Sequence, residues 1–170
     1  MKDTDWAWLA GFIDGDGCLT CSVQTRQTKT HPYIGMFPRI IIAQCKKEVQ
    51  ILDYIVDLTG IGKVYMKKEK SNKFNSQDQG MYTVSKLKDV KYMCENILPY
   101  VIHKKRQCIN MLKIVTIKLK AGRGPKRNPI EDTLECAKLA INLNPNVTTS
   151  NLKYDWTYWE KEIPRVYSLY

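Results

Sequence analysis

The stretch LAGFIDGDG, residues 9–17, constrains the fold of this 170-residue chain more than any other. It opens with apolar residues of the kind that form a buried helix. Thr4 or Asp5 can cap such a helix, and we expect it to run from Trp6 to about Ile13. The helix then meets two acidic residues and two glycines. Carboxylates at this end face the negative end of the helix dipole, so they are unfavourable unless a cation offsets them.

The acids Asp14 and Asp16 and the glycines between and after them predict a site for a hard cation. Gly15 and Gly17 let the backbone turn sharply and can leave a carbonyl oxygen exposed beside the acids. Mg²⁺ and Ca²⁺ prefer such oxygen ligands, whereas zinc does not. One helix end supplies too few ligands, so substrate phosphates or a second copy must complete the shell. The alternative interpretation is a plain turn, with Asp and Gly present for backbone geometry alone.

Gly11 and Gly15 are spaced four residues apart within the same helix. Small residues at this spacing allow two helix backbones to approach closely, a rule established in membranes and applied here by analogy. Packing of two chains along this helix would bring two Asp16 carboxylates together on a two-fold axis. Metal ions held close together in this way serve phosphodiester hydrolysis.

The charge of the chain favours a polyanionic partner. Lys and Arg number 27 against 17 Asp and Glu, which gives a net charge of +10 and a pI near 9.3. Nucleic acid is therefore the expected partner, ahead of a membrane surface. The six cysteines are scattered without a second pair to complete a zinc site, so we expect free thiols and a reducing compartment. No signal peptide, transit sequence or transmembrane run is evident, and no membrane partner is expected.

The hydrophobic periodicity predicts an α+β order of helix, two strands, helix and two strands, followed by further helices. Strands are expected at about 18–26, 34–44, 61–70 and 80–85, and further helices at about 46–59, 86–98, 103–120, 130–143 and after about 151. We expect a single domain over residues 1–170, with a core of about 4–121 and a C-terminal helical segment of about 129–170.

The sequence WLAGFIDGDG resembles the signature of the LAGLIDADG homing endonucleases, and the predicted order of elements matches the αββαββα core of that family. The likeness extends to IIIAQ (40–44), DLTGIGKV (57–64), LPYVIHKKRQ (98–107) and VTTSN (147–151). The chain is most similar to the single-motif, homodimeric branch. The resemblance implies a four-stranded antiparallel saddle that binds DNA, with extra C-terminal helices. It also implies intron homing: metal-dependent, site-specific double-strand cleavage by a homodimer at a long, near-palindromic target, leaving short 3′ overhangs.

The resemblance also implies roles for single residues. Asp16 matches the metal-ligating acid of the family, with the Gly15 carbonyl beside it, and Gln44 matches a glutamine that orders water. Arg106 stands where the family often has a lysine. Because arginine cannot act as a base at neutral pH, we expect it to stabilise charge, with Lys104 as the alternative. The expected catalytic set is therefore Asp16, Gln44 and Arg106, whereas Asp14 is expected to act as a structural cap more than as a metal ligand.

Alternation along the strands predicts the surface that meets DNA. In the first strand Leu19, Cys21 and Val23 should face the core, and the outward residues are Thr20, Ser22, Gln24 and Arg26. An antiparallel ribbon fits the major groove, where glutamine suits adenine, arginine suits guanine and hydroxyls are permissive. The neighbouring strands are expected to add Arg39, Tyr65, Lys67 and Thr83, with a phosphate contact as the alternative for Lys67. Phe37 and Ile41 share the outward face of Arg39, where they can contact thymine methyls.

The resemblance implies Mg²⁺ as cofactor, with Ca²⁺ supporting binding without cleavage. The implied partners are double-stranded DNA, a second copy of the chain and, in a dual role, intron RNA. Two alternatives remain on the same fold, namely an RNA maturase that assists intron splicing and a DNA-binding protein that does not cleave. An organellar location, in a chloroplast or mitochondrion, is expected if the gene is organellar, since no import signal is evident. Otherwise the protein is expected to be intracellular.

Overall fold

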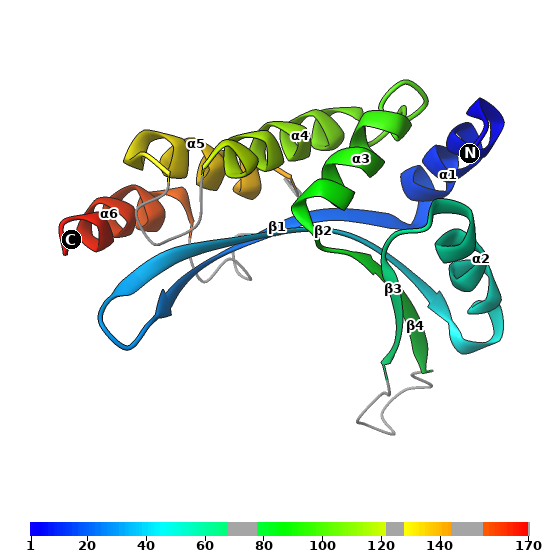
Figure 1. Cartoon of the computed structure of the whole chain (residues 1–170), viewed down its shortest axis with the longest axis horizontal. Coiled ribbons are helices and arrows are strands. Elements are labelled where there is room, and N and C mark those ends of the chain that lie inside the picture. Colours follow the sequence, from blue (N-terminus) through cyan, green and yellow to red (C-terminus); the bar gives the residue numbers. More distant parts are fainter. Residues whose placement is uncertain (68–77, 122–127, 144–154, 170) are drawn as a thin grey trace. The chain divides into compact units, whose positions relative to one another are not determined.

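The computed structural model describes residues 1–67, 78–121, 128–143 and 155–169. The helices and strands follow one another in the predicted order and confirm the α+β class (Figure 1). In chain order they are α1 (Asp3–Asp16), β1 (Gly17–Gln27), β2 (Pro32–Cys45), the short 3₁₀ helix η1 (Lys46–Glu48), α2 (Gln50–Thr59), β3 (Lys63–Lys67), β4 (Gln79–Val84), α3 (Leu87–Ile97), α4 (Lys105–Lys120), α5 (Ile130–Ile141) and α6 (Trp156–Tyr167). The stretch 147–151, one part of the family resemblance, lies outside the described residues.

Helix α1 is longer at both ends than the sequence predicts. It begins at Asp3 with Lys2 as its N-cap, so the expected cap at Thr4 or Asp5 is wrong. Asp5 instead lies in the first turn, where its Oδ2 accepts a hydrogen bond from the backbone N–H of Lys2 at 2.7 Å. The helix continues to Asp16. A Cβ on the next residue, Gly17, would lie 2.6 Å from the carbonyl oxygen of Ile13, so only glycine allows strand β1 to leave the helix here.

The strands form a four-stranded sheet in the order β1-β2-β4-β3. A tight turn joins β1 to β2, in which the backbone N–H of Thr28 donates to the carbonyl of His31 at 3.0 Å. Strands β2 and β4 are antiparallel from Ile40↔Val84 to Cys45↔Gln79, and β3 pairs with β4 from Lys63↔Thr83 to Lys67↔Gln79. The register determines which side chains share a face of the sheet.

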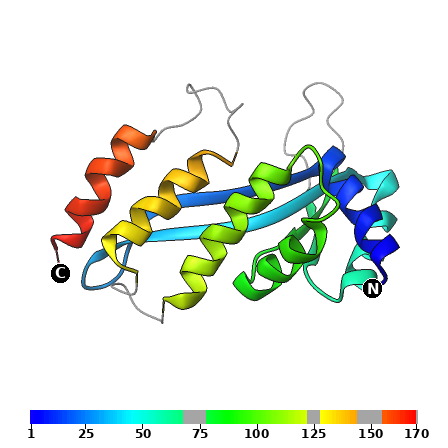
Figure 2. The same cartoon turned by 90° about the horizontal axis from the view of Figure 1, so that it is seen from above.

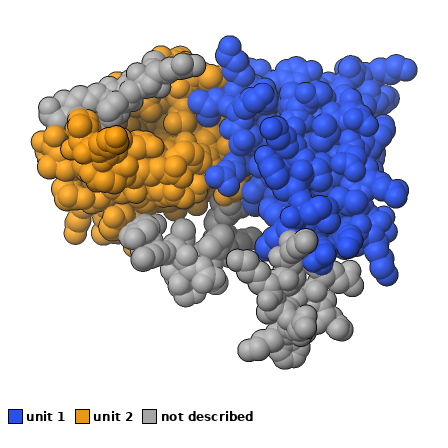
Figure 3. All heavy atoms as spheres, turned by 60° about the horizontal axis from the view of Figure 1, so that its bottom comes forward, with its two compact units in different colours: residues 1–18, 39–105 blue, residues 19–38, 106–170 orange. Residues whose placement is uncertain are grey.

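The chain forms two compact units (Figure 3). The first unit consists of Met1–Cys18 and Arg39–Lys105, and the second consists of Leu19–Pro38 and Arg106–Tyr170. Strand β2 contributes residues to both units. The single-domain organisation, with its boundary between about 121 and 129, stays a prediction.

In the first unit, α1 packs on α3, and α2 packs on β3 and β4 (Figure 1). The buried side of α1 consists of Trp6, Leu9, Ala10 and Ile13. Helix α2 ends at Gly60, which adopts the left-handed conformation with φ 67° and closes the helix as the sequence predicts. The ring of Tyr82 is completely buried, and its hydroxyl donates to the carbonyl of Ile61 at 3.0 Å.

In the second unit, α4, α5 and α6 lie over one side of the β1–β2 ribbon (Figure 2). The hydroxyl of Thr25 in β1 donates to Glu162 Oε1 in α6 at 3.2 Å, which ties the last helix to the ribbon. The thiol of Cys136 in α5 lies 4.0 Å from the carbonyl of Ile114 in α4. Burial raises the pKa of Cys136 to about 12, and none of the six cysteines, all within the described residues, forms a disulfide.

Across the described residues, no helix combines the length and the apolar character that crossing a membrane would require.

Candidate functional site

The structure brings Asp16 and Gln44 into direct contact. Asp16 is the last residue of α1 and is exposed, and Gln44 lies near the end of β2. The Nε2 of Gln44 donates to Asp16 Oδ2 at 2.8 Å. Gln44 has the strand parity of Ile40 and Ile42, both fully buried, so it points to the side of the sheet that meets the helices. Two residues chosen separately from the sequence therefore belong to one site.

Asp14 serves a different purpose, although it lies only two residues away. Its carboxylate accepts hydrogen bonds from three consecutive backbone N–H groups, those of Ile102 (2.6 Å), His103 (3.1 Å) and Lys104 (2.9 Å). Burial favours the neutral carboxyl, but these donors and the nearby Lys104 charge outweigh it, so the pKa of Asp14 lies below its usual value. Asp14 therefore ties the segment before α4 to the end of α1, as its expected capping role implies.

Lys104 supplies the cation that the end of α1 requires. Its ammonium donates to the backbone carbonyl oxygen of Asp14, one of the carbonyls that a helix C-terminus leaves unpaired. Burial raises the pKa of the Cys18 thiol, and the Lys104 charge partly opposes that rise, which places the ammonium near the start of β1 as well. Arg106 lies in the first turn of α4, is exposed and belongs to the second unit, so its role stays a prediction.

The donors at this helix end fit a hard cation but are few. Asp16 offers a carboxylate with one hydrogen bond, and Gly15 beside it is exposed. No group of three or more His, Cys, Asp or Glu residues that could hold a metal ion occurs within the described ranges. Oxygen donors of this kind suit Mg²⁺.

The side of α1 opposite its buried face is open and largely apolar. Gly11 and Gly15 are exposed, and a Cβ added at either would meet nothing within 4 Å. Beside them Trp8 is 39% exposed, stacks on Phe12 with ring centroids 5.6 Å apart and meets Tyr54 of α2 edge-on at 5.6 Å. This face is therefore free to accept another helix.

Register and strand parity place all four expected DNA-contacting residues of the first unit on one face. Thr83 lies opposite Lys63 on β3 and Ile41 on β2, and the same parity holds for Tyr65 and Lys67. Arg39 is exposed and shares the parity of Ile41 along β2. This face is opposite to the one that carries the buried Ile40, Ile42 and Tyr82.

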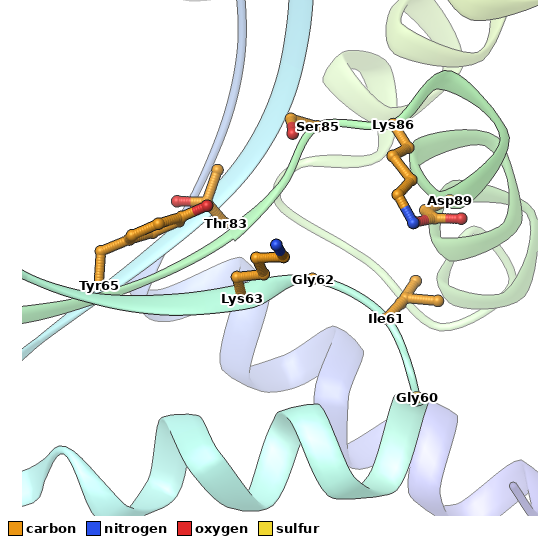
Figure 4. A pocket seen from close by; sticks show the side chains of 9 residues that line it. All are labelled: Gly60, Ile61, Gly62, Lys63, Tyr65, Thr83, Ser85, Lys86 and Asp89. Atoms are coloured by element: carbon orange, nitrogen blue, oxygen red, sulfur yellow. The ribbon is translucent and has the colours of Figure 1, made fainter.

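A shallow pocket of about 250 Å³ opens where β3 and β4 meet the start of α3 (Figure 4). Besides Tyr65 and Thr83, it is lined by Gly60, Ile61, Gly62, Lys63, Ser85, Lys86 and Asp89. The ammonium of Lys86 lies 3.9 Å from the Asp89 carboxylate, and the Lys86 side chain is 82% exposed. Two lysines and three hydroxyl-bearing side chains thus extend the polar face. Lys63 and Lys86 are not among the residues that the sequence predicts to contact DNA.

In the second unit the predicted alternation of β1 is found at the start of the strand, over residues 19–22, and is not seen in the burial of later residues. Leu19 and Cys21 are buried, whereas Gln24 and Arg26 are exposed. Thr25 faces α6, since its hydroxyl reaches Glu162, so its neighbours along the strand point to the opposite side. Thr20 and Ser22, the other expected contacts, are half-buried, as is Val23.

These features define a class: an α+β protein with paired strands, an open glycine-bearing helix face and a carboxylate at the end of that helix. The family model described as LAGLIDADG endonuclease matches residues 9–116, which is more than half of the chain. The chain belongs to the LAGLIDADG endonuclease family.

Known proteins with related sequences or folds agree with this family assignment. A relative from Neurospora crassa, described as "Probable intron-encoded endonuclease 4", is 28% identical over 140 residues. The match covers 82% of this chain and 23% of that protein, so this chain spans about a quarter of the length of that relative.

Two solved structures share the fold. The archaeal intron-encoded homing endonuclease I-Vdi141I, complexed with DNA, is similar with a TM-score of 0.78 and 20% identity over 99% of each chain. The homing endonuclease I-CvuI, in complex with the I-CreI target in the presence of Mg, gives a TM-score of 0.76 and 20% identity over 96% of each chain. Both confirm the predicted LAGLIDADG fold.

Proposed function

We propose that the chain is a metal-dependent, site-specific endonuclease that cleaves double-stranded DNA in intron homing. The observation that carries this proposal is the contact between Asp16 and Gln44 at 2.8 Å, with Asp14 next to it fully engaged by backbone donors. The helix thus ends on two acids with separate tasks. Only Asp16 has a carboxylate available for a cation.

In this proposal Asp16 and the Gly15 carbonyl would hold a Mg²⁺ ion, which would supply an activated water and charge neutralisation for phosphodiester hydrolysis. Gln44 fixes the orientation of the Asp16 carboxylate through its Nε2 and offers its remaining polar atoms to order water. Lys104 or Arg106 stabilises the charge of the phosphate, and the position of Lys104 on the Asp14 carbonyl favours Lys104.

The proposed active species is a homodimer packed along α1. The open face of Gly11 and Gly15 permits close approach of a second α1, and the exposed Trp8 and Tyr54 gain burial at such an interface. A two-fold axis along this face brings two Asp16 carboxylates to neighbouring phosphates. Two offset cuts follow, with the short 3′ overhangs that the family resemblance implies.

In each unit, the residues proposed to contact DNA lie on the outward faces of its strands. The first unit contributes Arg39, Tyr65, Lys67 and Thr83, and the second contributes Thr20, Ser22, Gln24 and Arg26. Lys63 and Lys86 of the shallow pocket add positive charge suited to phosphate contacts. The DNA complexes of I-Vdi141I and I-CvuI support DNA as the partner. A second I-CvuI structure, with its own target in the presence of Ca, supports a role for divalent cations.

The test is cleavage of a library of DNA duplexes with Mg²⁺, followed by sequencing of the ends. Wild type is expected to cut a near-palindromic subset, whereas Asp16→Asn is expected to bind the same subset without cutting. The asparagine keeps an oxygen that can accept from Gln44, so the fold should be retained. Asp57→Asn, which changes an exposed acid of α2, is the matched control and should cut normally.

The outcomes separate the alternatives on the same fold. Ca²⁺ in place of Mg²⁺ should support binding without cutting. Cutting by Asp16→Asn at a rate near wild type would refute the catalytic assignment. Binding without cutting by wild type would instead indicate a DNA-binding protein, and selective binding of intron RNA would indicate a maturase.

A further inference from the structure

We propose that Gln24, Arg26, Gly35 and Phe37 act as one unit that reads a guanine, in which Gln24 and Phe37 hold Arg26 in place. We call these residues the Arg26 cluster. All of them belong to the second unit of the chain. The inference rests on the proposed DNA-binding function, and it assigns the base read by this part of the surface and the residues that determine it.

The guanidinium of Arg26 is held on two sides. Its Nε and Nη2 both donate to the side-chain oxygen of Gln24, at 3.3 and 3.2 Å. Its carbon Cζ lies 4.2 Å from the centroid of the Phe37 ring, a cation–π geometry. No Asp or Glu in the described part of the chain forms an ion pair with Arg26, so its charge remains available. An exposed arginine with this support is pre-organised for binding.

Gly35 provides the space in which the Phe37 ring lies. A Cβ at Gly35 would be 2.8 Å from both Cε2 and Cζ of Phe37, so the ring lies directly over the glycine backbone. Gly35 is buried although it shares the parity of the exposed Arg39, which the covering ring explains. A glycine inside a strand often marks such a close approach. The Phe37 ring can therefore lie against Arg26 only because residue 35 has no side chain.

The hydrogen bonds determine which atoms remain for DNA. Arginine has five N–H donors and no acceptor, and the Nε and Nη2 edge of Arg26 faces Gln24. The Nη1 and Nη2 hydrogens at the far end of the guanidinium remain free. Gln24 uses its oxygen on Arg26 and can offer only the donors of its NH₂ group. The cluster therefore presents donors alone.

A surface of donors matches guanine. Its O6 and N7 are two adjacent acceptors in the major groove, and arginine contacts both at once. Adenine readout by glutamine needs the amide oxygen to accept from N6, and that oxygen of Gln24 is already engaged. The pairing of Gln24 with adenine expected from the sequence is therefore replaced by a positioning role. Phe37, expected to contact thymine methyls, instead holds the Arg26 guanidinium through a cation–π contact.

The test profiles binding and cleavage over a library of single-base target variants. Wild type should prefer guanine at one symmetric pair of positions. Arg26→Ala should abolish this preference, and Phe37→Leu and Gln24→Ala should each reduce it by about tenfold. Asp57→Asn, which changes an exposed acid of α2 outside the cluster, should retain the guanine preference and is the control.

A double variant shows whether Phe37 acts through Arg26. The Arg26→Ala, Phe37→Leu protein should discriminate bases no worse than Arg26→Ala alone. A further loss would give Phe37 a DNA contact of its own and overturn the inference. Loss of adenine preference at a second position in Gln24→Ala would likewise show that Gln24 reads a base directly.

NMR of the free protein tests the cluster without DNA. The Nε–H signal of Arg26, identified by its absence in Arg26→Ala, should be shifted upfield by the Phe37 ring and return towards the free value in both Phe37→Leu and Gly35→Ala. An unshifted wild-type signal would overturn this inference and leave the proposed function standing. A wild-type protein that neither binds nor cuts any duplex would overturn the proposed function and this inference with it.

Discussion

Replacing Asp14 with alanine should destabilise the protein without touching the carboxylate proposed to bind metal. The substitution removes the acceptor for the three backbone N–H groups of Ile102, His103 and Lys104. It also removes the link between the end of α1 and the segment that leads into α4. The backbone carbonyl that binds the Lys104 ammonium is retained, so the loss isolates the side chain.

The expected loss follows from the number of hydrogen bonds. At about 1 kcal/mol net for each bond, the three together contribute about 3 kcal/mol to the free energy of unfolding. With a urea m-value of about 2 kcal/mol/M, the unfolding midpoint should fall by roughly 1.5 M. Asp14→Asn keeps one acceptor oxygen and should lose about half as much.

The loss should depend on pH in a defined direction. The folded pKa of Asp14 is lowered below the usual value of about 3.9. A depressed pKa stabilises the folded state above the unfolded value, and this contribution disappears as the pH falls through the folded value. The difference between wild type and Asp14→Ala should therefore be constant from pH 7 to about 5 and should shrink below about pH 4.

Urea unfolding followed by circular dichroism measures these differences. Asp57→Ala, at an exposed acid of α2, is the control and should change the free energy of unfolding by less than about 0.5 kcal/mol. An Asp14→Ala protein as stable as this control, at pH 7, would refute the anchoring role of Asp14.

Three further predictions concern glycines and charge. Gly62→Ala should cost about 3 kcal/mol by thermal unfolding, because φ is 82° and a Cβ would lie 2.5 Å from the Tyr82 ring. Gly60→Ala, with φ 67° and no atom within 4 Å, should cost only about 1 kcal/mol; equal losses would contradict this account. Gly11→Leu should separate the α1 helices and give monomer or aggregate by sedimentation, whereas an active wild-type monomer would disprove the dimer. Lys67→Ala should weaken DNA binding at all sequences and lower its salt dependence, and a change in base preference would instead indicate base contact.

Much of the fold can be predicted from the sequence because strand and helix periods are local properties. The alternation of Leu19 and Cys21 with polar residues predicts which side of β1 is buried, and burial in the second unit agrees. The family signature and the order of elements predicted the LAGLIDADG fold. The first helix was placed less well, since its N-cap is Lys2 and not Thr4 or Asp5. Lys2 is not a residue type that sequence patterns place at an N-cap, and Asp5, whose carboxylate accepts from the Lys2 backbone N–H, lies at the third helical position.

The candidate site, too, was predicted from the sequence only in part. The sequence alone determined that two carboxylates and two glycines follow an apolar helix, and that the chain carries a large positive charge. Residue type alone does not distinguish Asp14 from Asp16, because both are aspartates in the same short turn, and only the family resemblance predicted a cap at Asp14 and a metal ligand at Asp16. The tertiary structure shows the physical difference, since their partners lie 88 and 28 residues away in the chain.

Tertiary structure also determined which polar atoms remain available. From the sequence, Gln24 offers a donor and an acceptor to any base, and Phe37 is an apolar residue on an exposed face. In the folded chain the Gln24 oxygen binds Arg26, and the Phe37 ring lies between Gly35 and that guanidinium. A hydrogen-bonding atom that is already paired within the protein has little to offer a base. The Gln24–Arg26 hydrogen bond joins residues two apart in β1, whereas the Arg26–Phe37 contact joins β1 to β2 and therefore depends on the fold.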